Sequence, residues 1–431
     1  MKKEKPGSFA AALLPKRLPR NAIIFSLVSF LNDVSSEMIF PILPIFFTTV
    51  LGAPAFVVGM MEGVAHTLET LFRGASGYYS DRQKKRRPLV ISGYGISALA
   101  KPAFAFAGGW PFALAVRSID RVGKGMRVTA RDAMLAEDSR GPDMGKVFGV
   151  RKMADSAGAV AGPIITFAIL AYAASSIPLE GTYRLIFLLS FIPAAAGVAL
   201  LFFLREKART ASREPIFAAI KETLLPPPGP WRSFLGISAV FGLGNISYAF
   251  FILAASDAGA SPAVATLLYV LFNIFYMLFA VPAGALTGKI GSKKMLLATF
   301  LSYAAVCAIF AAAPLLLGGA LGANFAGVPF FPLALGFAMY GIFSACYETV
   351  ARIYIAEHFP NKRLGSALGA YNIVLGMLAL PSGLLAGILY PLQSPQGASM
   401  AFIFGGLCAV CAAVGTLVYY RHGVHVVENP A

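Results

Sequence analysis

Charged residues are scarce in this chain of 431 residues: only 13% are charged, whereas 57% are hydrophobic. A soluble domain carries about 25% charged and about 45–50% apolar residues. The apolar residues here form long runs, such as 186–204, 263–285 and 400–420. A run of about 18 or more residues with few charges crosses a hydrocarbon core of about 30 Å as a helix. The composition argues against a soluble fold and predicts an all-α membrane protein.

Cysteine is also rare, and the sequence lacks the motifs of pumps and hydrolases. Four cysteines lie inside apolar runs, and only Cys408 and Cys411 have CxxC spacing, with no second pair or histidine to complete a metal site. No GxxxxGK[ST], HExxH or GxSxG is present. We therefore expect no ATP-driven pump, no enzyme, no metal and no cofactor. A membrane-embedded enzyme would need a catalytic motif and a membrane sensor a signalling domain, and neither is visible.

Positive charge is abundant, and its distribution indicates a topology. The net charge is +16, and Lys and Arg fall in alternate gaps between the apolar runs. Basic gaps are the N-terminal tail, 82–87, 205–221, 289–294 and 362–363, whereas the gaps 51–54, 108–111, 256–261, 313–332 and 391–398 have no Lys or Arg. This alternation is the positive-inside pattern, so both termini are expected in the cytoplasm. It argues against a nucleic-acid partner. The first run contains Asp33 and Glu37, which a cleaved signal peptide would not.

The apolar runs divide into two groups of six. We predict a basic tail at 1–20, a six-helix bundle at 21–204, a central loop at 205–230, a second six-helix bundle at 231–420 and a tail at 421–431. The expected helices are 21–50, 55–79, 88–106, 111–130, 148–172, 183–204, 231–255, 262–287, 294–315, 331–356, 364–390 and 398–420. The loop ends in the sequence PPPGP at 226–230.

The two halves repeat one another. The segment 77–87 at the end of the second helix matches 284–294 at the end of the eighth, with glycine, cation and basic cluster in equivalent places. The pairs Ala130-Arg131 and Ala136-Glu137 likewise match Ala351-Arg352 and Ala356-Glu357. Parallel repeats of six helices predict two bundles around an axis along the membrane normal.

The segment 77–87, GYYSDRQKKRR, resembles the loop signature of the major facilitator superfamily, although Lys84 replaces its second glycine. The stretches NDVSSEM at 32–38 and DRVGKGMR at 120–127 are similar to those of a bacterial branch of that superfamily. The resemblance covers essentially the whole chain. It implies a secondary transporter that works by alternating access in a bacterial inner membrane, with a small-molecule substrate, and we expect a monomer.

Charged residues within the predicted helices are the candidates for the substrate and proton pathway, because each costs about 2.5–3.5 kcal/mol in a membrane unless it faces a cavity or a partner. Asp120 is expected to pair with a neighbouring cation. Ion pairs that only hold the bundle together are the alternative role for several of them. The candidates of the N-terminal half are Asp33, Glu37, Glu62, Glu69, Lys101, Arg117, Asp120, Arg121 and Lys124, and those of the C-terminal half are Glu348 and Arg352. The fifth helix adds the charges of Arg151, Lys152 and Asp155, which are not among these candidates.

Gating residues follow from the resemblance. Gly77 permits close helix packing, and the aspartate of the loop signature, here Asp81 followed by Arg82, faces the eleventh helix and a cation of the fourth. Arg127 and Arg131 are the candidates for that cation. A purely topogenic role of this basic cluster is the alternative.

Gly158, Gly162 and Pro163 on the fifth helix resemble a motif of antiporters in the same superfamily, with Thr166 where the motif continues with glycine. Close helix packing would explain the two glycines equally well. The resemblance favours export.

The sequence therefore predicts proton-coupled export by antiport. Asp33 and Glu37 are four residues apart and share one helix face, where two carboxylates resist joint ionisation. Proton symport that takes up an organic anion or a metal chelate is the alternative.

Overall fold

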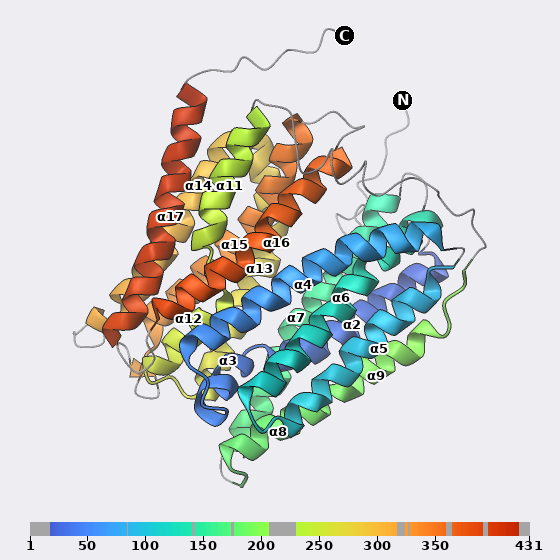
Figure 1. Ribbon diagram of the computed structural model, residues 1–431, viewed down its shortest axis with the longest axis horizontal. Helices are drawn as coiled ribbons and strands as arrows, with labels where there is room; N and C mark the ends of the chain where they lie inside the picture. The colour runs from blue at the N-terminus through green and yellow to red at the C-terminus, as the bar shows by residue number, and fades with distance from the viewer. Residues whose placement is uncertain are drawn as a thin grey trace, which may run out of the picture. The chain divides into compact units, whose positions relative to one another are not determined.

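The computed structural model describes residues 18–83, 85–139, 143–173, 176–206, 230–316, 324–325, 328–358, 364–390 and 395–421 (Figure 1). These residues are helical apart from short connections and one small antiparallel hairpin, in which β1 (Asn324–Phe325) pairs with β2 (Val328–Pro329). The all-α prediction is confirmed for this part of the chain. Most of the predicted tails and central loop, namely 1–17, 207–229 and 422–431, lies outside the described residues.

Ten helical segments of the described chain are long and apolar enough to cross a membrane. Two further helices, α4 (Ala55–Arg82) and α6 (Trp110–Asp138), are 28 and 29 residues long. At about 1.5 Å per residue each rises more than about 40 Å, which exceeds the hydrocarbon thickness. Both α4 and α6 are therefore long enough to cross a membrane. They differ from the ten apolar segments in the charged side chains that they carry.

The described residues pack into two compact units. The first comprises Met1–Phe40 and Leu71–Arg213, and the second Pro41–Thr70 and Glu214–Ala431. The chain crosses between the units at Phe40 and again inside α4. This grouping follows packing, whereas the predicted bundles at 21–204 and 231–420 follow the sequence repeat and stay a prediction.

In the first unit, α2 (Arg20–Ile39) lies along α7 (Met144–Ala173), and α5 (Arg87–Ala103) lies along α6 (Figure 1). The short helices α8 (Leu179–Leu189) and α9 (Phe191–Leu201) follow, and α9 packs against α2 and α5. Two glycines of α7 allow a close contact between α7 and α2. A side chain on Gly158 or Gly162 of α7 would collide with the α2 backbone, at the carbonyls of Phe30 and Val34. Small residues at such crossings let two backbones approach within a membrane.

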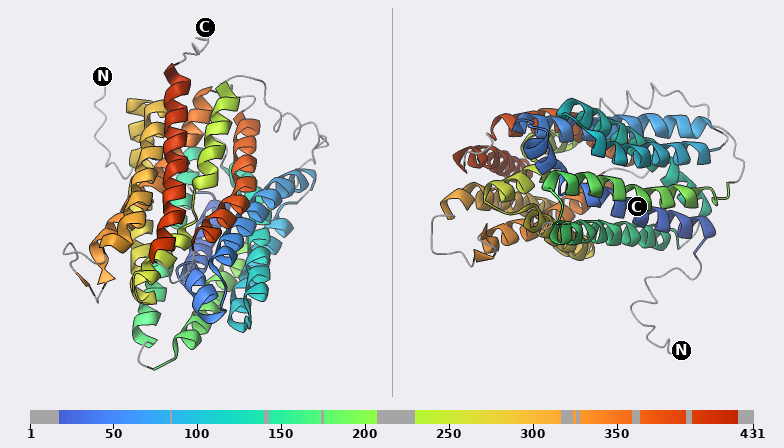
Figure 2. Two further views of the ribbon diagram at one scale, coloured as in Figure 1. Left: turned by 60° about the vertical axis from the view of Figure 1, so that its left-hand side comes forward. Right: turned by 90° about the horizontal axis from the view of Figure 1, so that it is seen from below.

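The second unit contains α3 (Leu43–Ile45), the π-helix η1 (Phe46–Val50), the first part of α4, and the helices of the C-terminal half. These helices are α11 (Pro230–Gly244), α12 (Tyr248–Asp257), α13 (Pro262–Ile290), α14 (Ser292–Leu316), α15 (Phe330–His358), α16 (Leu364–Ile388) and α17 (Pro395–Arg421). The pair α13 and α15 packs closely, and α17, red in Figure 2, runs beside α11 and α14. The core of the second unit is rich in aromatic residues, with Phe241, Phe251 and Tyr340 among the buried rings.

Three of the predicted helices, at 21–50, 183–204 and 231–255, are each divided into more than one helix, although each remains one candidate membrane span. The first interruption follows the end of α2 at Ile39, and Pro41 and Pro44 come directly after it. The second interruption, at Ser190, separates α8 from α9 and lies three residues before Pro193. Proline removes a backbone donor and clashes with the preceding turn, which accounts for both. Pro102 likewise precedes the change from α5 to the 3₁₀ turn η2 (Phe104–Phe106).

The third interruption, at 245–247 between α11 and α12, contains no proline. The Tyr303 hydroxyl satisfies two backbone groups at this interruption. It accepts a hydrogen bond from the Ile246 N–H at 2.7 Å and donates one to the Gly244 carbonyl at 3.0 Å. Ser382 donates to the Asn245 carbonyl at 3.3 Å, and Ser247 caps α12 by accepting from the Ala249 N–H. Irregular backbone at membrane depth needs such partners.

We predict that Tyr303→Phe lowers the melting temperature of the purified protein, because one hydroxyl satisfies two buried backbone groups. Leaving a buried polar group unsatisfied costs about 1–3 kcal/mol. Tyr172→Phe, at a largely exposed tyrosine, is the matched control. Equal melting temperatures for the two variants in a thermal unfolding assay would show that Tyr303 does not support the interruption.

Candidate functional site

The inner face of α6 carries a cluster of charges in the first unit. Arg117, Asp120 and Arg121 are 3%, 4% and 6% exposed. Asp120 lies between the two arginines, with Oδ2 at 3.2 Å from Nε of Arg121 and at 3.8 Å from Nη1 of Arg117. The Ser97 hydroxyl of α5 also donates to Asp120. The carboxylate therefore orients two cations on one helix face, as expected from the sequence.

Lys101 and Phe40 complete this cluster. Lys101, at the end of α5, is 2% exposed, and its Nζ donates to the Ser35 hydroxyl at 2.8 Å and to the Asn32 carbonyl at 3.4 Å. The ring of Phe40 lies against both guanidiniums, 4.6 Å from that of Arg117 and 4.9 Å from that of Arg121. We call Lys101, Arg117, Asp120 and Arg121 the α6 cation cluster.

A second group of charges lies where α2 meets α7. The carboxyl groups of Asp33 and Asp155 are neighbours across this contact. Two carboxylates so close together resist joint ionisation. Asp155 also lies 3.1 Å from Nζ of Lys152 and 3.8 Å from Nη1 of Arg151. Lys124 of α6 and Glu37, one turn further along α2, lie within electrostatic reach of Asp33.

Asp155 was not among the residues predicted for the site, although a signal for it exists. Gly158 packs on α2 beside Asp33, and its missing side chain would meet the Cβ of that aspartate. Asp155 precedes Gly158 by one turn on the same helix. Reading the glycine pair as the contact face of α7 would have directed Asp155 toward α2.

The predicted gate has a different cation from the one implied by the resemblance. Asp81, at the end of α4, pairs with Arg86 at 2.6 Å, and Arg86 also pairs with Glu137 at the end of α6 at 2.7 Å. Arg127 and Arg131 are held elsewhere, since Arg127 stacks on the Tyr94 ring at 4.3 Å and Arg131 pairs with Asp132 at 2.9 Å. The assignment of either residue to Asp81 is therefore wrong for this structure.

The other gating candidates lie near these groups. Arg82 stacks on the ring of Tyr78 at 4.1 Å, and Gly77 packs against the methyl group of Thr129 on α6. Gly162 packs on α2 at Glu37, and Pro163 lies inside α7 without ending it.

The remaining predicted pathway residues lie in the second unit. Glu62 is 3.5 Å from the Tyr248 hydroxyl, and Glu69 lies two turns further along α4. Glu348 and Arg352 on α15 are both more than half exposed and 3.8 Å apart, and the Tyr276 hydroxyl donates to Glu348 at 3.0 Å. The structure thus brings together the residues of α2, α5 and α6 but leaves Glu348 and Arg352 as a separate pair.

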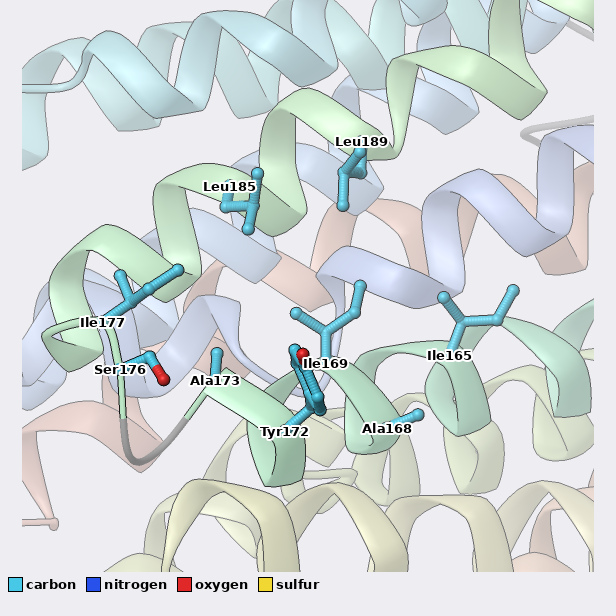
Figure 3. Close-up of a pocket in the computed structure, with 9 residues that line it drawn as sticks. All are labelled: Ile165, Ala168, Ile169, Tyr172, Ala173, Ser176, Ile177, Leu185 and Leu189. Carbon is cyan, nitrogen blue, oxygen red and sulfur yellow. The ribbon is translucent and has the colours of Figure 1, made fainter.

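An apolar groove on α7 and α8 is not this site (Figure 3). It is lined without any charged residue, by Ile165, Ala168, Ile169, Tyr172, Ala173, Ser176, Ile177, Leu185 and Leu189. Such a surface suits acyl chains better than a polar solute. Among the described residues, no three His, Cys, Asp or Glu side chains come together as metal ligands.

The long apolar helices and the charges buried among them define a multi-pass membrane protein, and its relatives give the family. The family model of the Major Facilitator Superfamily matches residues 25–254 and 232–430. An uncharacterized transporter of that type from Methanocaldococcus jannaschii is 31% identical over 405 residues, which are 93% of this chain and 94% of the relative. An uncharacterized protein of Mycobacterium tuberculosis is 25% identical over 382 residues, 87% of each chain. The chain belongs to the Major Facilitator Superfamily, which confirms the predicted resemblance, and it is a multi-pass secondary transporter.

Solved structures show the same fold at low sequence identity. A nucleoside transporter aligns with a TM-score of 0.75 and 14% identity, over 93% of this chain and 100% of its own. A D-xylose–proton symporter aligns with a TM-score of 0.68 and 16% identity, over 92% of this chain and 96% of its own. Identities this low show the fold alone.

We predict that Asp120→Asn destabilises the protein more than any exposed carboxylate change. Removing one partner of a buried ion pair costs about 3–5 kcal/mol. Asp132→Asn, which breaks the partly exposed pair with Arg131, is the control with the same chemical change on the same helix. Thermal unfolding in detergent measures both variants, and an equal loss would refute a central role for Asp120.

Proposed function

We propose that this protein is a proton-coupled transporter of a small polar or charged organic solute, and that the pair of Asp33 and Asp155 carries the coupled proton. The observation behind this proposal is that the two carboxyl groups are neighbours where α7 packs on α2 at Gly158. Such a pair titrates as one unit, since the second charge is resisted by the first. A single proton can therefore leave and return with a large change in local charge.

The position of the pair makes that change mechanically relevant. Asp33 and Asp155 lie on α2 and α7 near Gly158, where a side chain in place of this glycine would meet the Cβ of Asp33. Loss of the proton would leave two carboxylates in contact, and like charges at this distance repel. Arg151, Lys152 and Lys124 would offset part of that repulsion. Proton release would thus alter the α2–α7 contact, which alternating access could use.

We propose twelve membrane spans, with α4 and α6 added to the ten apolar ones. The lengths of both helices support this, and so does the alternation of basic and neutral gaps, which assigns the termini and the 205–230 loop to the cytoplasm. The corresponding location is the cytoplasmic (inner) membrane of a bacterium, with the protein as a monomer.

Asp81 is proposed as a gating residue together with Arg86 and Glu137. The buried side chain of Arg86 ties the end of α4 to the end of α6, whereas the Asp81 carboxylate stays 56% exposed. Asp81 is therefore held by Arg86 while more than half of its side chain stays exposed, where a further contact can form as the protein changes state.

The direction of transport depends on other residues than the coupling does. The sequence predicts export because of Gly158, Gly162 and Pro163, but both glycines have a packing role against α2 that accounts for them. Export by antiport and uptake by symport differ in the direction in which protons accompany the solute, and one assay separates them.

That assay uses proteoliposomes with a trapped pH dye and a panel of solutes added outside. Entry by antiport makes the lumen alkaline, and entry by symport makes it acidic. We predict that Asp155→Asn and Asp33→Asn abolish the pH change while exchange of labelled solute across the membrane survives. Asp143→Asn, a partly exposed carboxylate just before α7, should behave as wild type. A pH change of wild-type size in both Asp33→Asn and Asp155→Asn would refute the proposal.

We predict that tags at both termini and in the 205–230 loop are accessible only from the cytoplasm, because the basic gaps lie there. Tags in 256–261 and 391–394 should be accessible only from the opposite side. Impermeant labelling of intact cells and of inverted vesicles measures this. Termini on opposite sides would mean that α4 or α6 does not span the membrane.

A further inference from the structure

We infer that Lys101 takes up the proton that the carboxyl pair of Asp33 and Asp155 releases, so that its amine is neutral in one state of the transport cycle and an ammonium in another. The step moves one proton from the carboxyl group of Asp33 to Nζ of Lys101. A neutral carboxyl group and a neutral amine thereby become a carboxylate and an ammonium. This inference rests on the proposed proton coupling and names the residue that receives the proton.

The first observation is the number of hydrogen-bond acceptors around Lys101. The residue is 2% exposed, and its Nζ donates to the Ser35 hydroxyl at 2.8 Å and to the Asn32 carbonyl at 3.4 Å. An ammonium has three N–H donors, whereas a neutral amine has two. Two acceptors therefore match the neutral amine, and a third N–H would have no hydrogen-bond partner among the described residues.

The second observation is that both acceptors are uncharged. The Ser35 hydroxyl donates its own hydrogen to the Ser190 carbonyl, so its oxygen meets Lys101 as an acceptor. The other acceptor is a backbone carbonyl, and Lys101 makes no ion pair within the part of the chain that the structure describes. A charge removed from water without a paired ion is costly. A proton on this nitrogen therefore needs a counter-ion.

The third observation is that Asp33 is placed to become this counter-ion. Asp33 and Asp120 are the carboxylates within electrostatic reach of Lys101. Asp120 is already paired with Arg121 at 3.2 Å and accepts from the Ser97 hydroxyl. Asp33 directly follows Asn32, whose carbonyl accepts from Lys101. Transfer of the proton from Asp33 would create the ammonium and its counter-ion in the same step.

The charges around Lys101 also make it the member of the α6 cation cluster whose charge can change. The arginines of α6 cannot be deprotonated, and Arg121 and Arg127 lie within electrostatic reach of Lys101, where they oppose a permanent ammonium. Helix α9, which packs on α5, has no charged residue. The neighbouring charges on α2, α6 and α8 are Glu37, Arg117, Lys124 and the pair of Glu180 and Arg184.

The test is carbon-13 NMR of the purified full-length protein in detergent, with lysines labelled at Cε, whose chemical shift reports whether Nζ carries the additional proton. Lys101→Met and Lys101→Arg each remove the Lys101 resonance, so either variant assigns it. Between about pH 6 and pH 9 an ordinary lysine stays an ammonium. We expect the Lys101 resonance to move over this range, whereas the resonance of the partly exposed Lys146 stays constant.

The same measurement on Asp33→Asn tests the link to the carboxyl pair. Asparagine cannot become the counter-ion of the ammonium, so the midpoint of the Lys101 transition should fall by about one pH unit. A Lys101 resonance that stays at the ammonium position throughout this range overturns the inference. A midpoint that is the same in Asp33→Asn and in the wild type overturns it as well.

Proton flux in proteoliposomes separates proton uptake by Lys101 from a requirement for its charge. Arginine keeps the charge but cannot release its proton, and methionine carries no charge. Both Lys101→Arg and Lys101→Met should therefore lower the rate of the pH change by about tenfold or more, while exchange of labelled solute survives. Lys146→Met removes a partly exposed lysine and should behave as wild type.

The outcomes of the flux assay separate this inference from the proposed function. A pH change of wild-type size in Lys101→Arg, or loss of solute exchange in both Lys101 variants, overturns proton uptake by Lys101. When Asp33→Asn and Asp155→Asn have lost the pH change at the same time, the carboxyl pair keeps its proposed role. The NMR measurement needs neither a proton gradient nor a solute, so its result stands whichever solute is transported.

Discussion

The cost of placing a charge in a membrane governs the first unit of this transporter. Each ionised side chain at the centre of a bilayer costs about 2.5–3.5 kcal/mol, so the charges must face one another or a cavity. Helix α6 shows the consequence: it exposes Phe112 and Ile119 and buries Arg117, Asp120 and Arg121. It is polar inside and apolar outside, the reverse of a helix in a soluble protein. A hydropathy criterion that counts charges therefore passes over α6 even though it is long enough to span.

The same constraint explains which parts of the structure the sequence could predict. The apolar runs predict the helix positions, and local motifs such as 77–87 indicate the family. Each of these signals depends on residues that are near one another in the sequence. Spacing along one helix also predicted that Asp120 would pair with a neighbouring cation. The partners of Asp33 and Asp81 could not be found in this way, because Asp155 and Arg86 reach them through a helix crossing and a loop. Likewise, the interruption at 245–247 depends on Tyr303, which is distant in sequence.

The two units differ in chemistry as well as in sequence. The first has the carboxyl pair and the α6 cation cluster, whereas the second is dominated by stacked rings. Phe272 of α13 stacks on Tyr269 of the same helix and on Tyr340 of α15, and Phe343 stacks on Tyr347. Aromatic side chains have few rotamers and bury large areas, so such an array is stiff and does not change with protonation. The first unit thus brings charged side chains of several helices together, whereas the second has Glu62, Glu69 and the pair of Glu348 and Arg352 beside its rings.

Lys101 links the carboxyl pair to the charges of α6, and the sign of this link matters for coupling. Its Nζ donates to the Ser35 hydroxyl and to the Asn32 carbonyl of α2, and it lies within electrostatic reach of both Asp33 and Asp120. A change in the protonation of Asp33 would therefore change the electrostatic potential at α5 and α6. Because linkage between two binding events is reciprocal, a solute bound near Lys101 would in turn change proton binding at Asp33. An anion there would strengthen proton binding, and the two would move together by symport. A cation would weaken proton binding and compete with the proton, as antiport requires. The charge of the solute is therefore the quantity that decides between symport and antiport.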